Sequence, residues 1–204
     1  SDIFNLFNVI NDNRDELIYT LEIIPYSSEV FEFYRKNQET EPIKKAIRFI
    51  YLSNFGYMGK SESLRLDSRN HKENAIINLN KTIEFLKDCS IRFTNFDFRK
   101  AINSISLSEE NNKDAAFFYC DPPYLGTDDN YSNSFKEHDS IDLFNTLQKT
   151  GCKWAMSEFD NPFILNQAKE RNLNVIIIGE RKNLKNRRTE ILITNYKQQP
   201  NLFD

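Results

Sequence analysis

From residue 91 onward the chain alternates between short apolar runs and amphipathic stretches, and this alternation is the feature that most restricts its fold. The runs with the length and composition of β-strands are SIRFTNFDF, which ends near Asp97, then AAFFYC, KWAMSEF, NVIIIGE and TEILITNY. Helical patterns lie between several of them, notably at residues 140–150 and 162–172. Strands that alternate with helices form parallel sheets with right-handed crossovers. The second half of the chain is therefore predicted to be a mainly parallel α/β sheet.

The last two apolar runs have no helical pattern between them, so they are predicted to form a C-terminal antiparallel hairpin. The residues that join them, RKNLKNRR at 181–188, carry five positive charges and no acid. A charge run of this kind usually forms a solvated surface. We expect it to be a basic loop at the end of the hairpin.

The first part of the chain is predicted to be helical. Residues 1–24 place apolar side chains at spacings of three and four, with Asn-Asp-Asn between two short stripes. Residues 41–53 begin with a proline suited to a first helical turn, and 74–86 again have a helical period. The polar stretch between these two helices, 54–71, is expected to be an irregular loop.

The composition predicts a small intracellular protein without a broad positive surface. The net charge is −3, so a polyanion could be bound only by local basic patches. The three cysteines, Cys89, Cys120 and Cys152, lie far apart and form no metal-ligand spacing, which indicates a reducing compartment and no zinc site. No apolar run approaches the length of a membrane span. We expect a cytoplasmic monomer that binds neither metal nor membrane.

One short stretch, YCDPPYLG at 119–126, points to a binding site. The apolar run stops at Asp121, and ligands in open α/β sheets bind at the carboxyl ends of strands. Pro122 and Pro123 fix the backbone and present carbonyl groups without amide hydrogens of their own. A carboxylate and a fixed carbonyl accept hydrogen bonds from a planar amino group, and Tyr124 can stack on its ring. The stretch is therefore predicted to bind a flat group that carries an NH2.

This arrangement resembles the Asp-Pro-Pro-Tyr signature of amino-methyltransferases, and the segments around it resemble the Dam-type (alpha-group) DNA adenine methyltransferases over nearly the whole chain. NYSNSF at 130–135 is similar to the YxxxSF region of that family, and RRTEILITNY at 187–196 to its closing R-x-x-E segment. IYLSNFGYMGK at 50–60 lies where the family has an FYLNxxxFNG-like loop. The set of matches is specific, although most of its members are individually short.

The resemblance implies a Rossmann-like sheet that transfers a methyl group from S-adenosylmethionine to the exocyclic amino group of an adenine flipped out of double-stranded DNA. Acceptors of hydrogen bonds at that amino group stabilise the charge that develops on nitrogen. The expected catalytic residues are Asp121, Pro122, Pro123 and Tyr124. The residues that match cofactor contacts of the family are Asp97, Phe98, Asp121 and Ser157.

The resemblance also implies where DNA is bound. A small helical insertion at residues 41–88 is expected to recognise the target, after first helices at 1–40 and before a catalytic α/β domain at 89–204. The expected DNA contacts are Tyr57, Lys60, Arg65, Arg69, Lys72, Tyr131, Arg181, Lys182, Lys185, Arg187 and Arg188. Methylases of this kind serve in restriction-modification systems or in phages and mobile elements, so a restriction endonuclease is a further expected partner.

The chain departs from the family at the cofactor loop, Phe-x-Gly-x-Gly. Its five glycines, at positions 56, 59, 126, 151 and 179, have no such context. SDIFNLFNVIND at the start is similar to the helix that follows the second strand of the family. The resemblance therefore implies a methyltransferase that is incomplete at its N-terminus, with the cofactor loop and the ribose-binding acid upstream of Ser1.

Other functions fit the same residues. Within methyl transfer, the acceptor could be RNA adenine or a glutamine side chain, although protein-directed enzymes usually carry Asn where this chain has Asp121. From another class, the chain could be a catalytically inactive DNA-binding subunit that retains the fold. A generic α/β protein with a chance motif is the remaining alternative.

Overall fold

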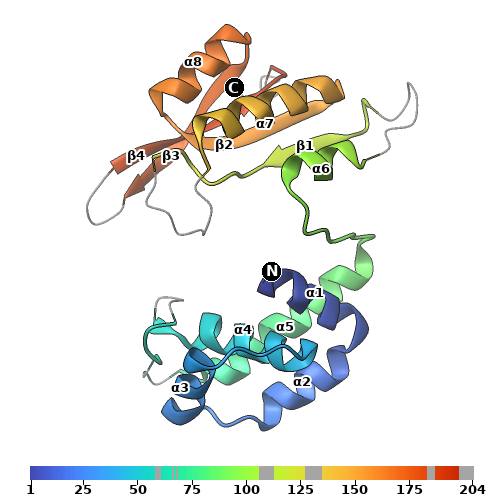
Figure 1. Ribbon diagram of the computed structural model, residues 1–204, viewed down its shortest axis with the longest axis vertical. Coiled ribbons are helices and arrows are strands. Elements are labelled where there is room, and N and C mark those ends of the chain that lie inside the picture. Colours follow the sequence, from blue (N-terminus) through green and yellow to red (C-terminus); the bar gives the residue numbers. More distant parts are fainter. Residues whose placement is uncertain are drawn as a thin grey trace, which may run out of the picture. The chain divides into compact units, whose positions relative to one another are not determined.

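The computed structural model describes residues 1–57, 61–65, 67, 69–105, 113–126, 135–182 and 187–197. The chain divides into two compact units, Ser1–Asn95 and Phe96–Asp204, each with a hydrophobic core of its own (Figure 1). We call them the first and the second unit.

The first unit is helical. Its helices are α1 (Asp2–Asp12), α2 (Arg14–Ile23), α3 (Ser28–Lys36), α4 (Pro42–Phe55) and α5 (His71–Asp88). The other four pack on α4, which buries one face that includes Ile47, Tyr51 and Phe55. Pro42 begins α4, and the Glu41 carboxylate accepts hydrogen bonds from two amides of its first turn. The predicted place of Pro42 in the first turn of this helix is therefore confirmed, and the Glu41 cap adds to it.

The helices predicted at the start of the chain, at 41–53 and at 74–86 are confirmed as α1, α2, α4 and α5, while α3 was not predicted. Helix α3 has only nine residues, but Ser27 caps it by accepting a hydrogen bond from the Val30 amide. Side chains from residues 1–40 and from 41–88 share one core. The role of 41–88 in target recognition stays a prediction.

The second unit is a mixed α/β layer. Its elements in chain order are α6 (Phe98–Asn103), β1 (Phe117–Cys120), α7 (Glu137–Thr150), β2 (Lys153–Phe159), α8 (Pro162–Glu170), β3 (Asn174–Lys182) and β4 (Arg187–Thr194). The strand order is β1-β2-β4-β3. Strand β1 pairs with β2 in parallel, and β4 pairs antiparallel with both β2 and β3.

The prediction of a mainly parallel sheet is wrong for the described strands. The predicted C-terminal hairpin is confirmed, but its second strand, β4, inserts between β2 and β3 instead of staying at the edge. Because of this insertion, an antiparallel pair of β2 and β4 replaces the parallel pair that β2 and β3 would form. Strands β1, β2 and β3 still run in one direction, so the βαβ pattern of the sequence was interpreted correctly, but strand order is not contained in that pattern.

The hairpin ladder also extends further than predicted. Residues 181 and 182 of β3 pair with residues 188 and 187 of β4, so the ends of the expected basic loop belong to strands. Residues 183–186 of that expected loop lie outside the described residues.

The strand predicted for SIRFTNFDF is wrong: residues 90–97 belong to no helix or strand. Ile91 and Phe96 are both exposed, so the alternation buries no single face, and burial of one face is what stabilises a strand. Asp97 instead caps α6, because its carboxylate accepts a hydrogen bond of 2.9 Å from the Arg99 amide.

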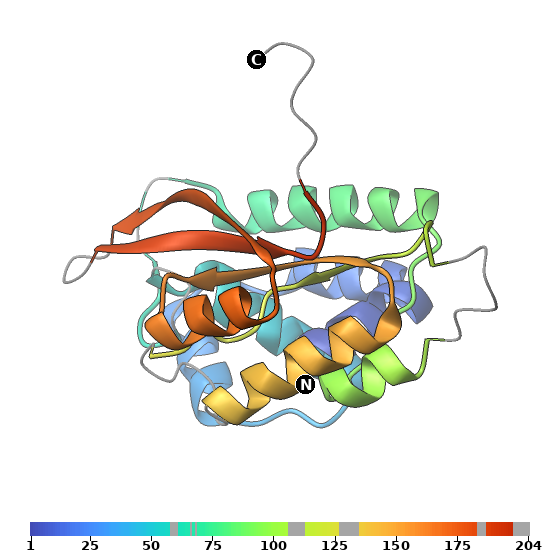
Figure 2. The same ribbon diagram turned by 90° about the horizontal axis from the view of Figure 1, so that it is seen from above.

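The core of the second unit lies between the sheet and its helices. Helices α6, α7 and α8 cover one face of the sheet (Figure 2), and side chains from all three belong to, or pack against, a core cluster that includes apolar residues of β2 and β4. The single tryptophan, Trp154 on β2, is fully buried and packs edge-on against Phe144 of α7. Its fluorescence therefore reports on the folding of the second unit.

Two isoleucines on paired positions of the hairpin provide a test of this core. Ile191 on β4 is 2% exposed, whereas its cross-strand partner Ile177 on β3 is 72% exposed. We expect Ile191→Ala to lower the free energy of unfolding by about 2–5 kcal/mol, because it opens a cavity in the core. Ile177→Ala is the matched control, with an expected change of about 0.5 kcal/mol or less. Urea unfolding followed by Trp154 fluorescence measures both, and equal losses would contradict the described packing.

Candidate active site

The site is built at the carboxyl end of β1. The parallel register places Cys120 opposite Met156, so the next residues of the two strands, Asp121 and Ser157, are neighbours. The buried Ser157 hydroxyl donates a hydrogen bond of 2.8 Å to Asp121 Oδ1, and it accepts one of 3.3 Å from the Tyr119 hydroxyl. Asp121 itself is exposed. A buried hydroxyl thus holds a carboxylate that solvent or a ligand can still reach.

Tyr124 is held at both its hydroxyl and its ring. Its hydroxyl donates a hydrogen bond of 3.0 Å to Glu190 Oε1 on β4. Its ring meets the ring of Phe159 on β2 edge-on, with centroids 4.7 Å apart. Burial raises the pKa of the Tyr124 phenol; Ser157 acts in the opposite direction, and the neighbouring carboxylates of Glu190 and Asp121 raise the pKa further. Tyr124 therefore remains a neutral hydrogen-bond donor at neutral pH.

Glu158, which follows Ser157 on β2, is a fully buried acid with 0% exposure. Its carboxylate accepts hydrogen bonds from the amides of Phe159, at 2.9 Å, and of Leu125, at 3.3 Å. Burial raises the pKa of Glu158 to about 7, although the two amide hydrogen bonds and the nearby Arg188 act in the opposite direction. Glu158 thus connects β2 to the residue that follows Tyr124.

Arg188 binds the segment that carries Tyr124 at Gly126. One guanidinium nitrogen, Nη2, donates a hydrogen bond of 2.6 Å to the carbonyl of Gly126, and the guanidinium carbon lies 5.3 Å from the centre of the Phe159 ring. Gly126 has a φ of +71°, which glycine adopts without steric cost. Arg188 was predicted to contact DNA phosphates, but the structure shows its side chain bound within the protein.

The predicted DNA contacts of the first unit are also engaged internally. The Lys72 ammonium donates to two backbone carbonyls at the end of α2. Arg69 forms an ion pair of 2.6 Å with Asp67, and Arg65 donates to a backbone carbonyl at 3.4 Å. Tyr57, in contrast, is 60% exposed. Lys72, Arg69 and Arg65 therefore all have partners within the first unit.

Several predicted DNA contacts fall outside what the structure describes. Lys60, Tyr131 and Lys185 lie outside the described residues, as do the side chains of Arg181, Lys182 and Arg187. Their proposed contacts therefore remain predictions from the sequence.

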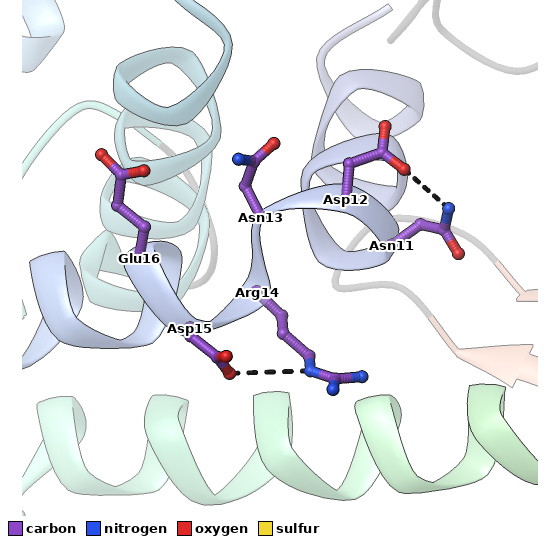
Figure 3. A pocket seen from close by; sticks show the side chains of 6 residues that line it. All are labelled: Asn11, Asp12, Asn13, Arg14, Asp15 and Glu16. Atoms are coloured by element: carbon purple, nitrogen blue, oxygen red, sulfur yellow. Dashed lines mark hydrogen bonds and ion pairs between the residues drawn. The ribbon is translucent and has the colours of Figure 1, made fainter.

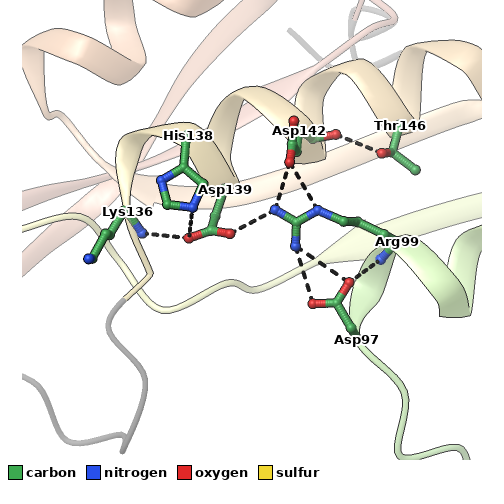
Figure 4. A network of polar contacts seen from close by, with 7 residues as sticks. All are labelled: Asp97, Arg99, Lys136, His138, Asp139, Asp142 and Thr146. Atoms are coloured by element: carbon green, nitrogen blue, oxygen red, sulfur yellow. Dashed lines mark hydrogen bonds and ion pairs between the residues drawn. The ribbon is translucent and has the colours of Figure 1, made fainter.

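Of the predicted cofactor contacts, Asp97 caps α6 (Figure 4), and Phe98 is the first residue of that helix. The Arg99 guanidinium pairs with Asp97 at 3.2 Å and with two acids of α7, Asp139 at 2.7 Å and Asp142 at 2.8 Å. The hydrogen bond from Arg99 lowers the pKa of Asp139 below its usual range. Phe98 packs under the same guanidinium, 4.3 Å from its carbon. Arg99 thus fixes the start of α6 against α7.

A separate hollow of about 390 Å³ lies in the first unit at the junction of α1 and α2, lined by Asn11 to Glu16 (Figure 3). Its side chains are polar and exposed, and they include an ion pair of 3.6 Å between Arg14 and Asp15. The hollow contains none of the residues predicted to act in catalysis. Its polar, solvated lining offers no chemistry that competes with the Asp121 site.

The described part of the chain contains no helix that is long and apolar enough to span a membrane. Nor do the described side chains bring three or more His, Cys, Asp or Glu together in a way that could hold a metal ion.

Two acids of the site were missed at the sequence level. Glu190 is the acid of the closing RRTEILITNY segment, so the motif contained the signal, but nothing in it indicated that Tyr124 is its partner. Glu158 directly follows Ser157, yet an acid at the end of an apolar run is usually exposed. Asp121 and Ser157 were both predicted as site residues, and the structure brings them together.

Comparison with known proteins adds to this geometry. A family model described as D12 class N6 adenine-specific DNA methyltransferase matches residues 1–191. A DNA adenine methylase of Haemophilus influenzae is 30% identical over 203 residues, covering 85% of this chain and 67% of that protein.

The buried acid leads to a prediction about pH. Because the pKa of Glu158 rises from an ordinary 4.5 to about 7 on folding, the folded state binds the proton more tightly than the unfolded state. The stability that comes from this group is present below about pH 4.5 and is lost as the pH rises to about 7. Relative to Glu158→Gln, the wild type should lose about 3 kcal/mol of unfolding free energy between these limits.

Urea unfolding at pH 5 and pH 8, again followed by Trp154 fluorescence, measures this difference. Glu180→Gln changes an exposed glutamate of β3 and should leave the pH dependence of the wild type intact. A Glu158→Gln protein whose stability falls with pH as steeply as that of the wild type would show that Glu158 is not the titrating group.

Proposed function

The chain belongs to the D12 class N6 adenine-specific DNA methyltransferases, and we propose that Asp121 and Tyr124 form the pocket in which the target adenine is methylated. The observation that carries the proposal is the Asp121 carboxylate, which a buried serine holds at the end of β1 while it stays exposed. Tyr124 lies three residues further along, with its own position set by contacts to β2 and β4.

The chemistry of the amino group explains why a carboxylate is needed there. The lone pair of the adenine amino nitrogen is delocalised into the ring, so the nitrogen is a poor nucleophile. Asp121 can accept a hydrogen bond from that amino group, which stabilises the positive charge that grows on nitrogen as it attacks a methyl group. Because Ser157 donates to only one oxygen of Asp121 in the hydrogen bond described, the carboxylate retains acceptor capacity for the base.

Adenine paired in a duplex cannot reach this carboxylate, so the base must leave the helix. Tyr124 is half-buried, and we propose that its exposed part stacks on the flipped base. Pro122 and Pro123 keep the short distance between Asp121 and Tyr124 rigid.

The methyl donor is proposed to be S-adenosylmethionine, which supplies an electrophilic methyl group when it is bound. The described residues fit one end of such a molecule. Asp97 keeps 58% of its side chain exposed although it caps α6, so its carboxylate can accept hydrogen bonds from an amino or hydroxyl group. Phe98, which follows Asp97, offers an aromatic ring. We propose both as contacts to the adenosine part, and Asp121 and Ser157 as contacts near the reacting methyl group.

The proposed DNA partner is double-stranded. Tyr57 and the basic residues at 181–187 are proposed to contact it, whereas the internal bonds of Arg188 and Lys72 favour a structural role for those two side chains. We further propose that residues 41–88 recognise the target sequence and that the protein is a monomer. Its proposed setting is a restriction-modification system, with an endonuclease as partner, or a phage.

Asp121→Ala tests the proposed mechanism. We expect methylation of duplex DNA to fall by about 10²–10³-fold or more, because the lost contact is strongest in the transition state. DNA affinity should change by less than about threefold, since ground-state binding rests on other contacts. Transfer of a tritiated methyl group to duplex DNA measures the rate. Asp114→Ala, at an exposed turn outside the site, is the matched control.

The same assay separates the alternative functions. Transfer of the label to RNA or protein in preference to DNA would favour another acceptor class, and DNA binding without any transfer by the wild type would favour an inactive subunit. A wild-type rate in the Asp121→Ala protein would contradict the mechanism.

A further inference from the structure

We propose that Glu190 is a positioning residue, which orients the Tyr124 ring for the flipped adenine. The inference rests on the proposed function of the Asp121 and Tyr124 pocket. Glu190 lies 66 residues after Tyr124 in the sequence and contacts it through the 3.0 Å hydrogen bond from the tyrosine hydroxyl. In this proposal Glu190 touches neither the base nor the cofactor, and it influences the bound base through Tyr124.

The backbone fixes the position of the glutamate. Glu190 is the β4 residue directly opposite Phe159 of β2, within a continuous antiparallel ladder. Paired residues in such a ladder direct their side chains to the same face of the sheet. Glu190 and Phe159 are therefore neighbours on one face of the sheet, and the Tyr124 side chain contacts both.

The two contacts restrain different motions of the tyrosine. The hydrogen bond to Glu190 holds the hydroxyl end, but by itself it would allow the ring to turn about its long axis. The edge-on contact with Phe159, at an interplanar angle of 86°, fixes the plane of the ring. Phe159 is itself buried, and the Arg188 guanidinium lies over its ring. Together these contacts define where the exposed part of the Tyr124 ring faces.

Orientation matters because stacking requires the tyrosine and the base to lie face to face. A free tyrosine side chain would have to be ordered each time a base enters, and this ordering weakens binding. A tyrosine that is already oriented avoids this cost at the binding step. Removal of the Glu190 acceptor should therefore act mainly on the binding of DNA substrate and less on the chemical step.

Three variants separate this role from a general effect on folding. Glu190→Ala removes the acceptor, Glu190→Gln keeps a carbonyl oxygen that can accept from Tyr124, and Tyr124→Phe removes the donor. Glu180→Ala, at the exposed glutamate of β3, is the matched control. Unfolding followed by Trp154 fluorescence shows whether each variant folds.

The first measurement needs no methylation. In protein labelled with 3-fluorotyrosine, the fluorine NMR signal that disappears in Tyr124→Phe belongs to Tyr124. We expect this signal to shift or broaden in Glu190→Ala and to keep its wild-type position in Glu190→Gln and Glu180→Ala. A Tyr124 signal that is unchanged in Glu190→Ala would overturn the inference.

The second measurement is a double-mutant cycle on methyl transfer to duplex DNA. We expect Glu190→Ala to raise KM for DNA by up to about 10-fold, with a smaller effect on kcat, and Glu190→Gln to restore KM. Because Glu190 acts through the Tyr124 hydroxyl, Glu190→Ala should have no further effect in a Tyr124→Phe background. Equal losses in both backgrounds would overturn the proposal.

The outcomes for the inference and for the proposed function can be told apart. If Asp121→Ala abolishes methylation while Glu190→Ala leaves KM and the fluorine signal unchanged, the proposed function stands and the positioning role fails. If the wild type transfers no methyl group but the fluorine signal moves in Glu190→Ala, the proposed function fails and the orientation of Tyr124 by Glu190 is supported.

Discussion

The ladder between β2 and β4 is the constraint on which the site depends. The last residues of β2 alternate between the two faces of the sheet, as in any strand. Ser157 and Phe159 face Asp121 and Tyr124, whereas Glu158 faces the core under the helices. The antiparallel pairing with β4 then brings Glu190 beside Phe159. A shift of one residue in this register would send each of these side chains to the opposite face and dismantle the site.

Much of this arrangement could be predicted from local sequence patterns. The apolar runs at 115–120 and 153–159 contain β1 and β2, and those at 174–180 and 189–196 cover most of β3 and β4, because buried strands are rich in apolar residues. Asp121 was placed correctly because a strand cannot continue through two prolines. The helices around Pro42 and Pro162 were also predictable, since proline is favoured in a first helical turn.

The rest could not be predicted because it depends on pairings between distant residues. No local pattern indicates that β4 lies between β2 and β3, and this order alone makes the sheet mixed. The partner of Tyr124 is 66 residues away, and Arg188 finds Gly126 across 62 residues. The cation stretches looked like a surface for phosphates, yet Arg188, Lys72 and Arg69 all have partners within the protein. A run of basic residues in a sequence therefore does not by itself predict a DNA-binding surface, because the folded protein can provide internal acceptors for their hydrogen bonds.

At position 158, the side chain that would best suit the apolar surroundings differs from the one that the geometry of the site requires. A leucine or methionine there would suit the apolar surroundings better than a carboxyl group that must be desolvated. Such a side chain, however, would leave the amides of Leu125 and Phe159 without their acceptor, at the base of the segment that carries Tyr124. An apolar residue at position 158 would therefore remove a desolvated carboxyl group from the core, but it would also remove the acceptor that holds the segment carrying Tyr124.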